Sequence, residues 1–517
     1  MTDGASQLPP AKLRAAAFLT LAALLLTLGL EIFGVIAPFR LKTLDLLFRH
    51  VPLAQASPEV VVVTVDQNDL DLTKDKGVTW PWPRQLYEHI IDYCSQAGAR
   101  AVIFDILFTE ASSYGPEDDH RLAQAAATAG NVVLPFFLSR EEKGANPLVP
   151  ALLHKAGLQI PGPLPLVPAG YRSVVTPVGP LLEAAQALGN VQIRPDADGI
   201  YRRVPLVFPF KDRWLPILSF AAFHRFRHNE PLKFIEGGLM VGNLRIPLDA
   251  QGNLLLKYRG PSRSHQRFSA ANVITSFNFK AHGQPPIYPP EAFAGKWVFV
   301  GLTAPGLLDL KASPMGGVYP GVEIHATLLD NLLQGDFLRT LPGWALWAWA
   351  LVLAAAVAVA VLFSPSLTVT LMAFFILLSV HLALAVIAFW TGRWADPVLP
   401  GIALALSFGL ATAYSYATEG RQKRYIRGMF GQYMSETVIS HLLAHPEKLK
   451  LGGERRRVTL FFSDLAGFTT ISERLDAETV VSLLNDYLSA MTEIILEEEG
   501  TVDKFEGDAI MALWGAP

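Results

Sequence analysis

Four long apolar runs limit what this chain can fold into. Each run has about the 20 residues that an α-helix needs to cross roughly 30 Å of hydrocarbon. Tryptophans at the ends of the second and third runs are typical of the boundary between lipid and water. We therefore predict a multi-pass membrane protein. The four predicted transmembrane helices are residues 15–39, 344–363, 367–390 and 398–417.

The composition agrees with a membrane protein and excludes other classes. The 517 residues are 51% hydrophobic and 17% charged, which is too apolar for an ordinary soluble protein. The formal net charge is −3 and the basic residues are scattered, so we expect no nucleic-acid partner. Cys94 is the only cysteine, which excludes an intramolecular disulfide. We interpret Cys94 as a small buried apolar residue.

Charges beside the spans predict the orientation in the membrane. Lys12 and Arg14 precede the first run, which could be a secretory signal, but no clear cleavage site follows it. We favour an uncleaved anchor. The flank after the last span is rich in basic residues, which are typical of the cytoplasmic side. We therefore place residues 1–14 and the C-terminus in the cytoplasm and residues 40–340 outside the inner (plasma) membrane. The basic residues of that flank are Arg421, Lys423, Arg424 and Arg427.

Two ionisable residues, Glu31 and His381, lie inside predicted spans. Such residues are costly in lipid and suggest an ion pathway, as in a transporter. We favour hydrogen bonds between helices or a position near the interface, because two isolated groups are little evidence for a pathway.

Residues 40–340 show the pattern of a mixed α/β domain. PEVVVVTVDQNDL and ARAVIFDILFTE are β-branched runs, and RQLYEHIIDYCSQAG between them has helical spacing. This order predicts a βαβ unit with a parallel sheet, which the runs GNVVLPFFL, YRRVPLVFPF, GNLLLKYRG and GKWVFVGLTAP would extend. Four carboxylates stand at strand ends, where open α/β sheets bind ligands, although caps and turns explain them as well. They are Asp66, Asp69, Asp105 and Glu110.

Several blocks of this region resemble the CHASE2 extracellular sensor domain. They are WPWPRQLYEHIIDYCSQAGARAVIFDILFTE, GNVQIRPDADGIYRRVPL, GKWVFVGLTAPGLLD and PGVEIHATLLDNLLQGDFL. The resemblance implies three transmembrane helices after the domain, a cytoplasmic output module, and an unknown extracytoplasmic ligand or partner. Asp105, Arg202, Arg203 and His325 are candidates for either ligand contacts or determinants of the fold.

The cytoplasmic connector, residues 421–457, begins with a basic stretch beside the membrane that can contact lipid phosphates. Apolar residues at helical spacing then predict a short amphipathic helix that pairs in a dimer. A plain linker is the alternative. The apolar residues are Val438, Ile439, Leu442 and Leu443.

The last segment, residues 458–517, predicts the first half of a split βαβ, ferredoxin-like α+β domain. A strand ends just before Asp464, a helix follows from the N-cap Asp476 to Gly500, and a hairpin turns at Glu506–Gly507. The apolar face of this helix includes Val481. The hairpin would lie beside the first strand and bring Asp508 near Asp464. Two converging carboxylates can bind the two divalent ions of phosphoryl chemistry.

FFSDLAGFT followed by DKFEGDAIMALWG closely resembles the class III nucleotide cyclases. The resemblance implies that Asp464 and Asp508 hold two Mg²⁺ or Mn²⁺ ions per site, with Leu465 contributing to the metal site. It implies that Lys504 recognises the adenine of ATP, and that the active site forms across a homodimer. The segment Ala466, Gly467, Phe468 and Thr469 would contact the triphosphate.

The resemblance covers about 60 residues of the cyclase domain. The family's transition-state Asn and Arg find no match in this chain, so we expect these 517 residues alone to be inactive or nearly so. For the complete protein we predict a CHASE2-regulated adenylate cyclase that converts ATP to cyclic AMP and pyrophosphate. A guanylate cyclase of the same family is one alternative. A non-catalytic CHASE2 receptor with a nucleotide-binding dimerisation module is another.

Overall fold

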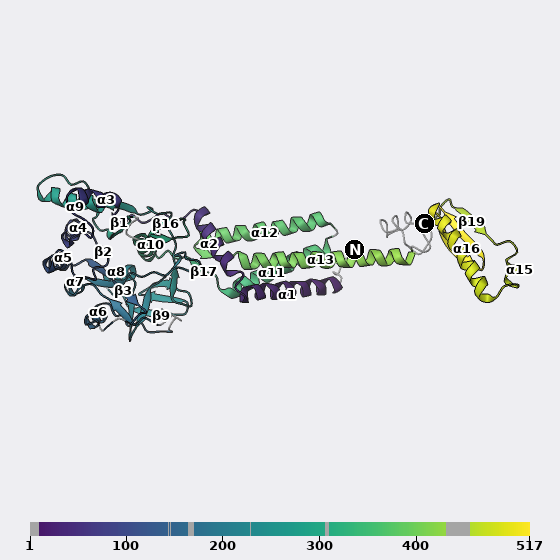
Figure 1. Ribbon diagram of the computed structural model, residues 1–517, viewed down its shortest axis with the longest axis horizontal. Coiled ribbons are helices and arrows are strands. Elements are labelled where there is room, and N and C mark those ends of the chain that lie inside the picture. The colour runs from purple at the N-terminus through teal and green to yellow at the C-terminus, as the bar shows by residue number, and fades with distance from the viewer. Residues whose placement is uncertain are drawn as a thin grey trace, which may run out of the picture. The chain divides into compact units, whose positions relative to one another are not determined.

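A seven-stranded, mostly parallel sheet forms the centre of the large α/β domain (Figure 1). The structure is a computed structural model. It describes residues 10–142, 144, 146–163, 170–227, 229–304, 310–364, 366–430 and 455–516. In the last long apolar helix, side chains are described as far as Thr418. The strand order is β13 (Gln266–Ser269), β1 (Val60–Val65), β14 (Trp297–Leu302), β2 (Ala101–Asp105), β3 (Val132–Ser139) and β4 (Ser173–Val175), with β5 (Ala187–Asn190) also paired to β3.

Every pairing in this sheet is parallel except that of β4 with β3. β1 and β14 are apolar and buried along almost their whole length, as expected of parallel strands covered on both faces. Helices α8 and α10 contact each other and pack on the sheet. A second group of helices also packs on the sheet, in which α4 contacts both α9 and α5. The helices of the domain are α3 (Gln67–Asp75), α4 (Arg84–Gln96), α5 (Pro116–Ala129), α6 (Val149–Ala156), α7 (Gly179–Ala184), α8 (Leu218–Phe226), α9 (Ala270–Ala281), the 3₁₀ turn η1 (Pro290–Ala292) and α10 (Gly321–Gln334).

The prediction that YRRVPLVFPF and GNLLLKYRG extend the main sheet is wrong. The first run forms β6 (Arg203–Pro205) and β7 (Val207–Phe210), and the second forms β12 (Asn253–Leu255). β6 pairs with β12, and β7 pairs with β8 (Arg213–Pro216), each as a separate antiparallel ribbon. A β-forming sequence indicates a strand but not its partner, because pairing depends on the tertiary surroundings of the strand. The remaining strands are β9 (Leu232–Ile235), β10 (Gly238–Val241), β11 (Leu244–Pro247), β15 (Leu310–Ala312), β16 (Val318–Pro320), β17 (Arg339–Thr340) and β18 (Arg393–Trp394).

Among the described residues, four helices are long and apolar enough to cross a membrane, as the sequence predicts. α11 (Gly343–Phe363) and α12 (Leu367–Trp390) begin and end within one residue of their predicted spans. α13 (Val398–Phe430) has an apolar part that ends at Thr418. α1, α11 and α13 pack together through a cluster of small and apolar side chains. The predicted helix with Val438, Ile439, Leu442 and Leu443 lies outside the described residues.

The first span differs from the predicted range 15–39. α1 spans Pro10–Ile32 and a second helix, α2, spans Ala37–His50. Gly34 has a left-handed φ of 72°, and the N–H of Val35 donates to the carbonyl of Leu30, so a Schellman motif ends α1. Pro38 lies in the first turn of α2, where proline is well tolerated.

The ionisable residues of the spans have polar partners, which confirms the preferred interpretation. Glu31 accepts two hydrogen bonds from Arg40 of α2 at 2.9 and 3.0 Å. Arg40 also donates to Asp396, just before α13, at 2.6 Å. His381 accepts from the indole N–H of Trp349 at 3.0 Å, and its Nε2 lies 2.9 Å from the carbonyl oxygen of Pro397.

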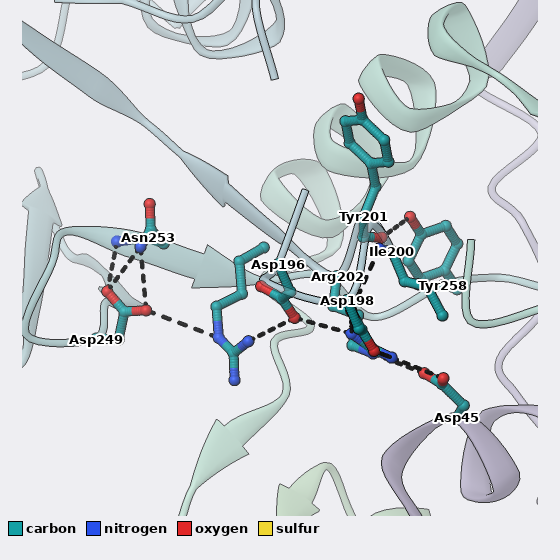
Figure 2. A network of polar contacts seen from close by, with 10 residues as sticks. Asp45, Asp196, Asp198, Ile200, Tyr201, Arg202, Asp249, Asn253 and Tyr258 are labelled. Atoms are coloured by element: carbon teal, nitrogen blue, oxygen red, sulfur yellow. Dashed lines mark hydrogen bonds and ion pairs between the residues drawn. The ribbon is translucent and has the colours of Figure 1, made fainter. Parts of the chain in front are cut away.

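A buried arginine joins α2 to the α/β domain (Figure 2). The guanidinium of Arg202 is fully buried and donates two hydrogen bonds to Asp45 of α2, at 2.6 and 2.7 Å. It also donates to Asp196 at 3.1 Å and to Asp198 at 2.8 Å. Burial disfavours the charged guanidinium, but hydrogen bonds with Asp198 and Asp45 outweigh it, so the pKa of Arg202 is raised. The neighbouring Arg203 is partly exposed and pairs with Asp196 at 2.7 Å.

His325 of α10 lies in the buried layer between helix and sheet. Its Nε2 is 3.3 Å from the carbonyl oxygen of Val191, and its Nδ1 is 3.1 Å from the hydroxyl of Ser219. Burial lowers the pKa of His325 to about 4. These contacts suit a neutral imidazole that donates from one nitrogen and accepts at the other.

The C-terminal segment has the predicted order of strand, helix and hairpin. β19 (Thr459–Ser463), β21 (Ala509–Trp514) and β20 (Thr501–Glu506) form an antiparallel sheet in this order. The short helix α15 (Phe468–Ser472) follows β19, and α16 (Ala477–Glu497) packs on β20. Asp476 caps α16, as predicted, by accepting from the N–H of Thr479 at 2.9 Å. Val481 is exposed, which differs from the expectation that it packs in a core. The core residues of this segment are Ile495, Val502, Ile510 and Ala512.

Replacing Arg202 should destabilise the α/β domain strongly. Arg202→Met leaves three carboxylates without their shared cation, which typically costs about 3–5 kcal/mol of unfolding free energy. Arg203→Met is the matched control and should cost about 1 kcal/mol or less, because its charge is partly exposed. Denaturant unfolding of the two variants measures both values. Equal losses would contradict the role given to Arg202.

Protonation of His325 should destabilise the fold below pH 6.5. The folded pKa, about 4, lies under the ordinary value of 6.5, so the unfolded state binds the proton more tightly between these values. Stability is therefore complete above pH 6.5 and falls by about 3 kcal/mol as the pH approaches 4. Thermal unfolding from pH 7 to 4 should show a shallower decline in His325→Gln than in the parent chain. Parallel pH profiles would refute this assignment.

Candidate functional site

The carboxylates of Asp464 and Asp508 meet at one end of the C-terminal sheet. Asp464 directly follows β19, and Asp508 directly precedes β21. These strands are antiparallel with Ser463 opposite Ile510, so the two aspartates stand side by side. The N–H of Leu465 donates to Asp508 at 3.1 Å. The structure thus brings together the two residues that the sequence proposes as metal ligands.

The carboxylate of Asp508 affects the acidity of Asp464. The charge of Asp508 raises the pKa of Asp464 above its ordinary value, although Asp464 is exposed to solvent. A raised pKa means that the site has more negative charge than its surroundings balance. A divalent cation between the carboxylates would remove this imbalance.

The donor set fits Mg²⁺ or Mn²⁺. Both ions prefer oxygen ligands, and Mg²⁺ commonly binds one or two carboxylates together with water and substrate phosphates. Among the residues that the structure describes, no cluster of three or more His, Cys, Asp or Glu side chains is suited to a metal. The pair Asp464 and Asp508 offers two carboxylate ligands, so water or another ligand would complete the coordination of such an ion.

The loop after Asp464 carries the residues proposed to contact the triphosphate. Gly467 has a left-handed φ of 78°, which favours glycine, and precedes α15. The N–H of Phe468 donates to the carbonyl of Leu465 at 3.2 Å. Within the described residues, the N–H groups of Ala466, Gly467 and Thr469 have no protein acceptor, so three donors in this loop are available to a ligand.

Lys504 lies on β20, on the same hairpin as Asp508. Its ammonium is 2.6 Å from the carboxylate of Glu506, and hydrogen bonding to Glu506 raises the pKa of Lys504. Both side chains are more than half exposed. The lysine is therefore charged and accessible, although in this conformation its partner is Glu506.

The strand-end carboxylates of the α/β domain mostly serve as caps. Asp66 caps α3 by accepting from the N–H of Asp69. Asp69 is fully buried and accepts from the N–H of Asp66, the hydroxyl of Ser269 and the N–H of Ala271, so it joins α3 to α9. Burial raises the pKa of Asp69. These contacts support the structural interpretation of both residues.

The other two strand-end carboxylates have different surroundings. The side chain of Asp105 is almost fully buried, with an oxygen 4.0 Å from Nε2 of His325. Glu110 is exposed in the loop after β2, and its carbonyl accepts from Arg84 at 3.1 Å. Cys94 is fully buried, which confirms the prediction of a small buried residue, and burial raises the pKa of its thiol.

Two polar contacts of α2 were not predicted from the sequence. Nothing in the sequence distinguishes Asp45 of α2, or Asp396 in the loop before α13, as a partner of a distant arginine. Their partners, Arg202 and Arg40, are 157 and 356 residues away in the chain.

Comparison with known protein families agrees with this architecture. Residues 18–362 match the CHASE2 domain, and residues 453–517 match the adenylate and guanylate cyclase catalytic domain.

Individual relatives are found among mycobacterial proteins. Uncharacterized protein Rv1320c of Mycobacterium tuberculosis is 35% identical over 109 residues, which are 21% of this chain and 19% of that protein. Uncharacterized protein Rv1318c of the same organism is 35% identical over 97 residues, or 19% of this chain and 18% of that protein. The chain thus spans about a fifth of the length of the curated relatives it matches.

The CHASE2 match covers most of the chain, from the first apolar helix to the end of the second. The chain therefore belongs to the CHASE2 family, and its CHASE2 domain is linked through apolar helices to a segment of a class III nucleotide cyclase catalytic domain.

Proposed function

We propose that the complete protein is a membrane-bound adenylate cyclase whose activity is controlled by its CHASE2 domain. The observation that carries this proposal is the adjacent pair Asp464 and Asp508, within a segment that matches the cyclase catalytic domain. The reaction joins the ribose 3′-oxygen of ATP to the α-phosphorus and releases pyrophosphate. Asp464 and Asp508 would hold two divalent ions, Mg²⁺ or Mn²⁺, which supply Lewis acidity at the attacking and leaving oxygens.

The chain's own groups would position the nucleotide. The N–H groups of Ala466, Gly467 and Thr469 are suited to phosphate oxygens, since each lacks a protein acceptor among the described residues. Lys504 is a hydrogen-bond donor, and N1 of adenine is an acceptor, whereas N1 of guanine carries a proton. This chemistry favours ATP as substrate. By the family resemblance, Lys504 and Asp508 of one chain would serve opposite sites of a homodimer.

The proposed orientation places the CHASE2 domain outside the inner membrane and the cyclase segment in the cytoplasm. Basic residues after the last span support this arrangement. An unknown ligand or partner of the CHASE2 domain would then act through the spans. Arg40 of α2 supports this route, because it binds both Glu31 at the end of α1 and Asp396 before α13. A movement of α2 is thereby shared by two membrane helices.

A guanylate cyclase of the same family is the second candidate. The cyclase match covers both activities by its description and does not distinguish ATP from GTP. Initial rates of cyclic nucleotide formation by the full-length gene product with Mg-ATP and with Mg-GTP distinguish the two activities. We expect ATP to be preferred.

Removing either carboxylate should abolish cyclisation. Asp464→Ala and Asp508→Ala in the full-length gene product are each expected to lower kcat by at least about 10²-fold, a typical loss for a group that stabilises charge in the transition state. Cyclic nucleotide formation, measured by chromatography, checks this. Asp486→Ala, an exposed position on α16, is the matched control and should keep the parent rate.

Two results would count against the proposal. Parent-like product formation by Asp464→Ala would remove the metal assignment. Absence of cyclic nucleotide formation by the folded parent, with Mg²⁺ or Mn²⁺ and either nucleotide, would favour a non-catalytic CHASE2 receptor.

A further inference from the structure

A cavity of about 350 Å³ lies beside β5, the strand that forms one edge of the parallel sheet. Its lining comes from the end of α6, the start of β5 and the end of α8. Its volume falls within the range of about 300–1,000 Å³ that is typical of small-molecule sites. The cavity lies at the start of β5, whereas Asp66 and Asp105 stand at the carboxyl ends of β1 and β2. It is therefore separate from the carboxylates that the sequence singles out.

The polar lining of this cavity is positively charged. Lys155 and Arg225 supply two cations, and the side chains of Gln186, His224 and Asn229 complete the polar set. Alanine, leucine and proline side chains make up the rest of the lining. No carboxylate is found among the described residues of the lining. An anionic group would therefore balance the charge of the cavity.

Both cations keep hydrogen-bond donors for a ligand. The ammonium of Lys155 donates to the carbonyls of Leu182 and Glu183 at the end of α7, which leaves its third hydrogen available. The side-chain amide of Gln186 lies at Nε and Nη2 of Arg225, which leaves the two hydrogens of Nη1. The protein contacts hold each cation in place without using all its donors.

The charges of Lys155 and Arg225 lie close enough to interact. Burial is the main cause of the lowered pKa of Lys155; Glu183 raises this pKa, and the neighbouring Arg225 lowers it. Two cations placed close together repel each other, and a bound anion would stabilise both.

We propose that this cavity binds a small anionic molecule, one that carries a carboxylate or phosphate group on a short apolar body, and that it is a ligand site of the CHASE2 domain. Lys155 and Arg225 bind the anionic group. The apolar side chains from α6, β5 and α8 contact the body of the ligand. This assignment is independent of the proposed cyclase activity.

Calorimetric titration of the purified full chain in detergent tests the proposal. Inorganic phosphate and succinate are the two probes, added at constant ionic strength adjusted with sodium chloride. We expect at least one probe to bind saturably, and Lys155→Gln/Arg225→Gln to weaken that binding at least tenfold. Phosphate binding alone would assign a phosphate ligand, and succinate binding alone a carboxylate.

A matched pair of substitutions outside the cavity controls for net charge. Lys233→Gln/Arg245→Gln removes the same two charges from exposed positions of β9 and β11 and should leave the affinity within twofold of the parent value. Arg225→Gln alone changes an exposed residue, so it tests the site even if the double variant does not fold. The proposal is overturned if neither probe binds the parent saturably, or if folded Arg225→Gln binds as tightly as the parent.

Discussion

The buried guanidinium of Arg202 is the interaction on which the arrangement of the CHASE2 domain and its first membrane helix depends. It binds Asp45 of α2 with two hydrogen bonds, and α2 follows α1 after a turn of four residues. Phe48 of the same helix packs against Tyr258 of the domain and Phe389 near the end of α12. α2 thus contacts both the domain and the membrane helices. A change in the domain that moves Asp45 would also move the ends of these helices.

The segments that could be predicted from sequence are those whose signals are local. Runs of about 20 apolar residues identify the spans, and buried β-branched runs identify β1, β2 and β14. The end of α1 at Ile32 was missed because an apolar count continues through Phe33 and Val35, although Gly34 and Pro38 mark the break. Tertiary pairing could not be predicted at β6 and β12, which form their own ribbon instead of joining the sheet.

The candidate sites also differ in whether they depend on local sequence signals or on contacts between distant parts of the chain. Asp464 and Asp508 could be placed together because one strand, one helix and one hairpin determine their positions. Asp396 and Asp45, the distant partners of Arg40 and Arg202, lie 356 and 157 residues away in the chain, and no periodicity in the sequence links them. The cavity with Lys155 and Arg225 likewise forms from two helices and an edge strand that meet only in the folded domain. Contacts between side chains that are distant in the sequence could therefore be identified only from the structure.

In the proposed mechanism, α2 couples the CHASE2 domain to the catalytic segment through the membrane helices. Cyclic nucleotide production by the full-length protein in membrane vesicles tests it, with Arg40→Gln compared with Lys42→Gln on the same helix. The account predicts that Arg40→Gln changes the rate about fivefold or more, the scale of a typical coupling free energy, and that Lys42→Gln does not. An unchanged rate in Arg40→Gln, with equal amounts of folded protein, would contradict it.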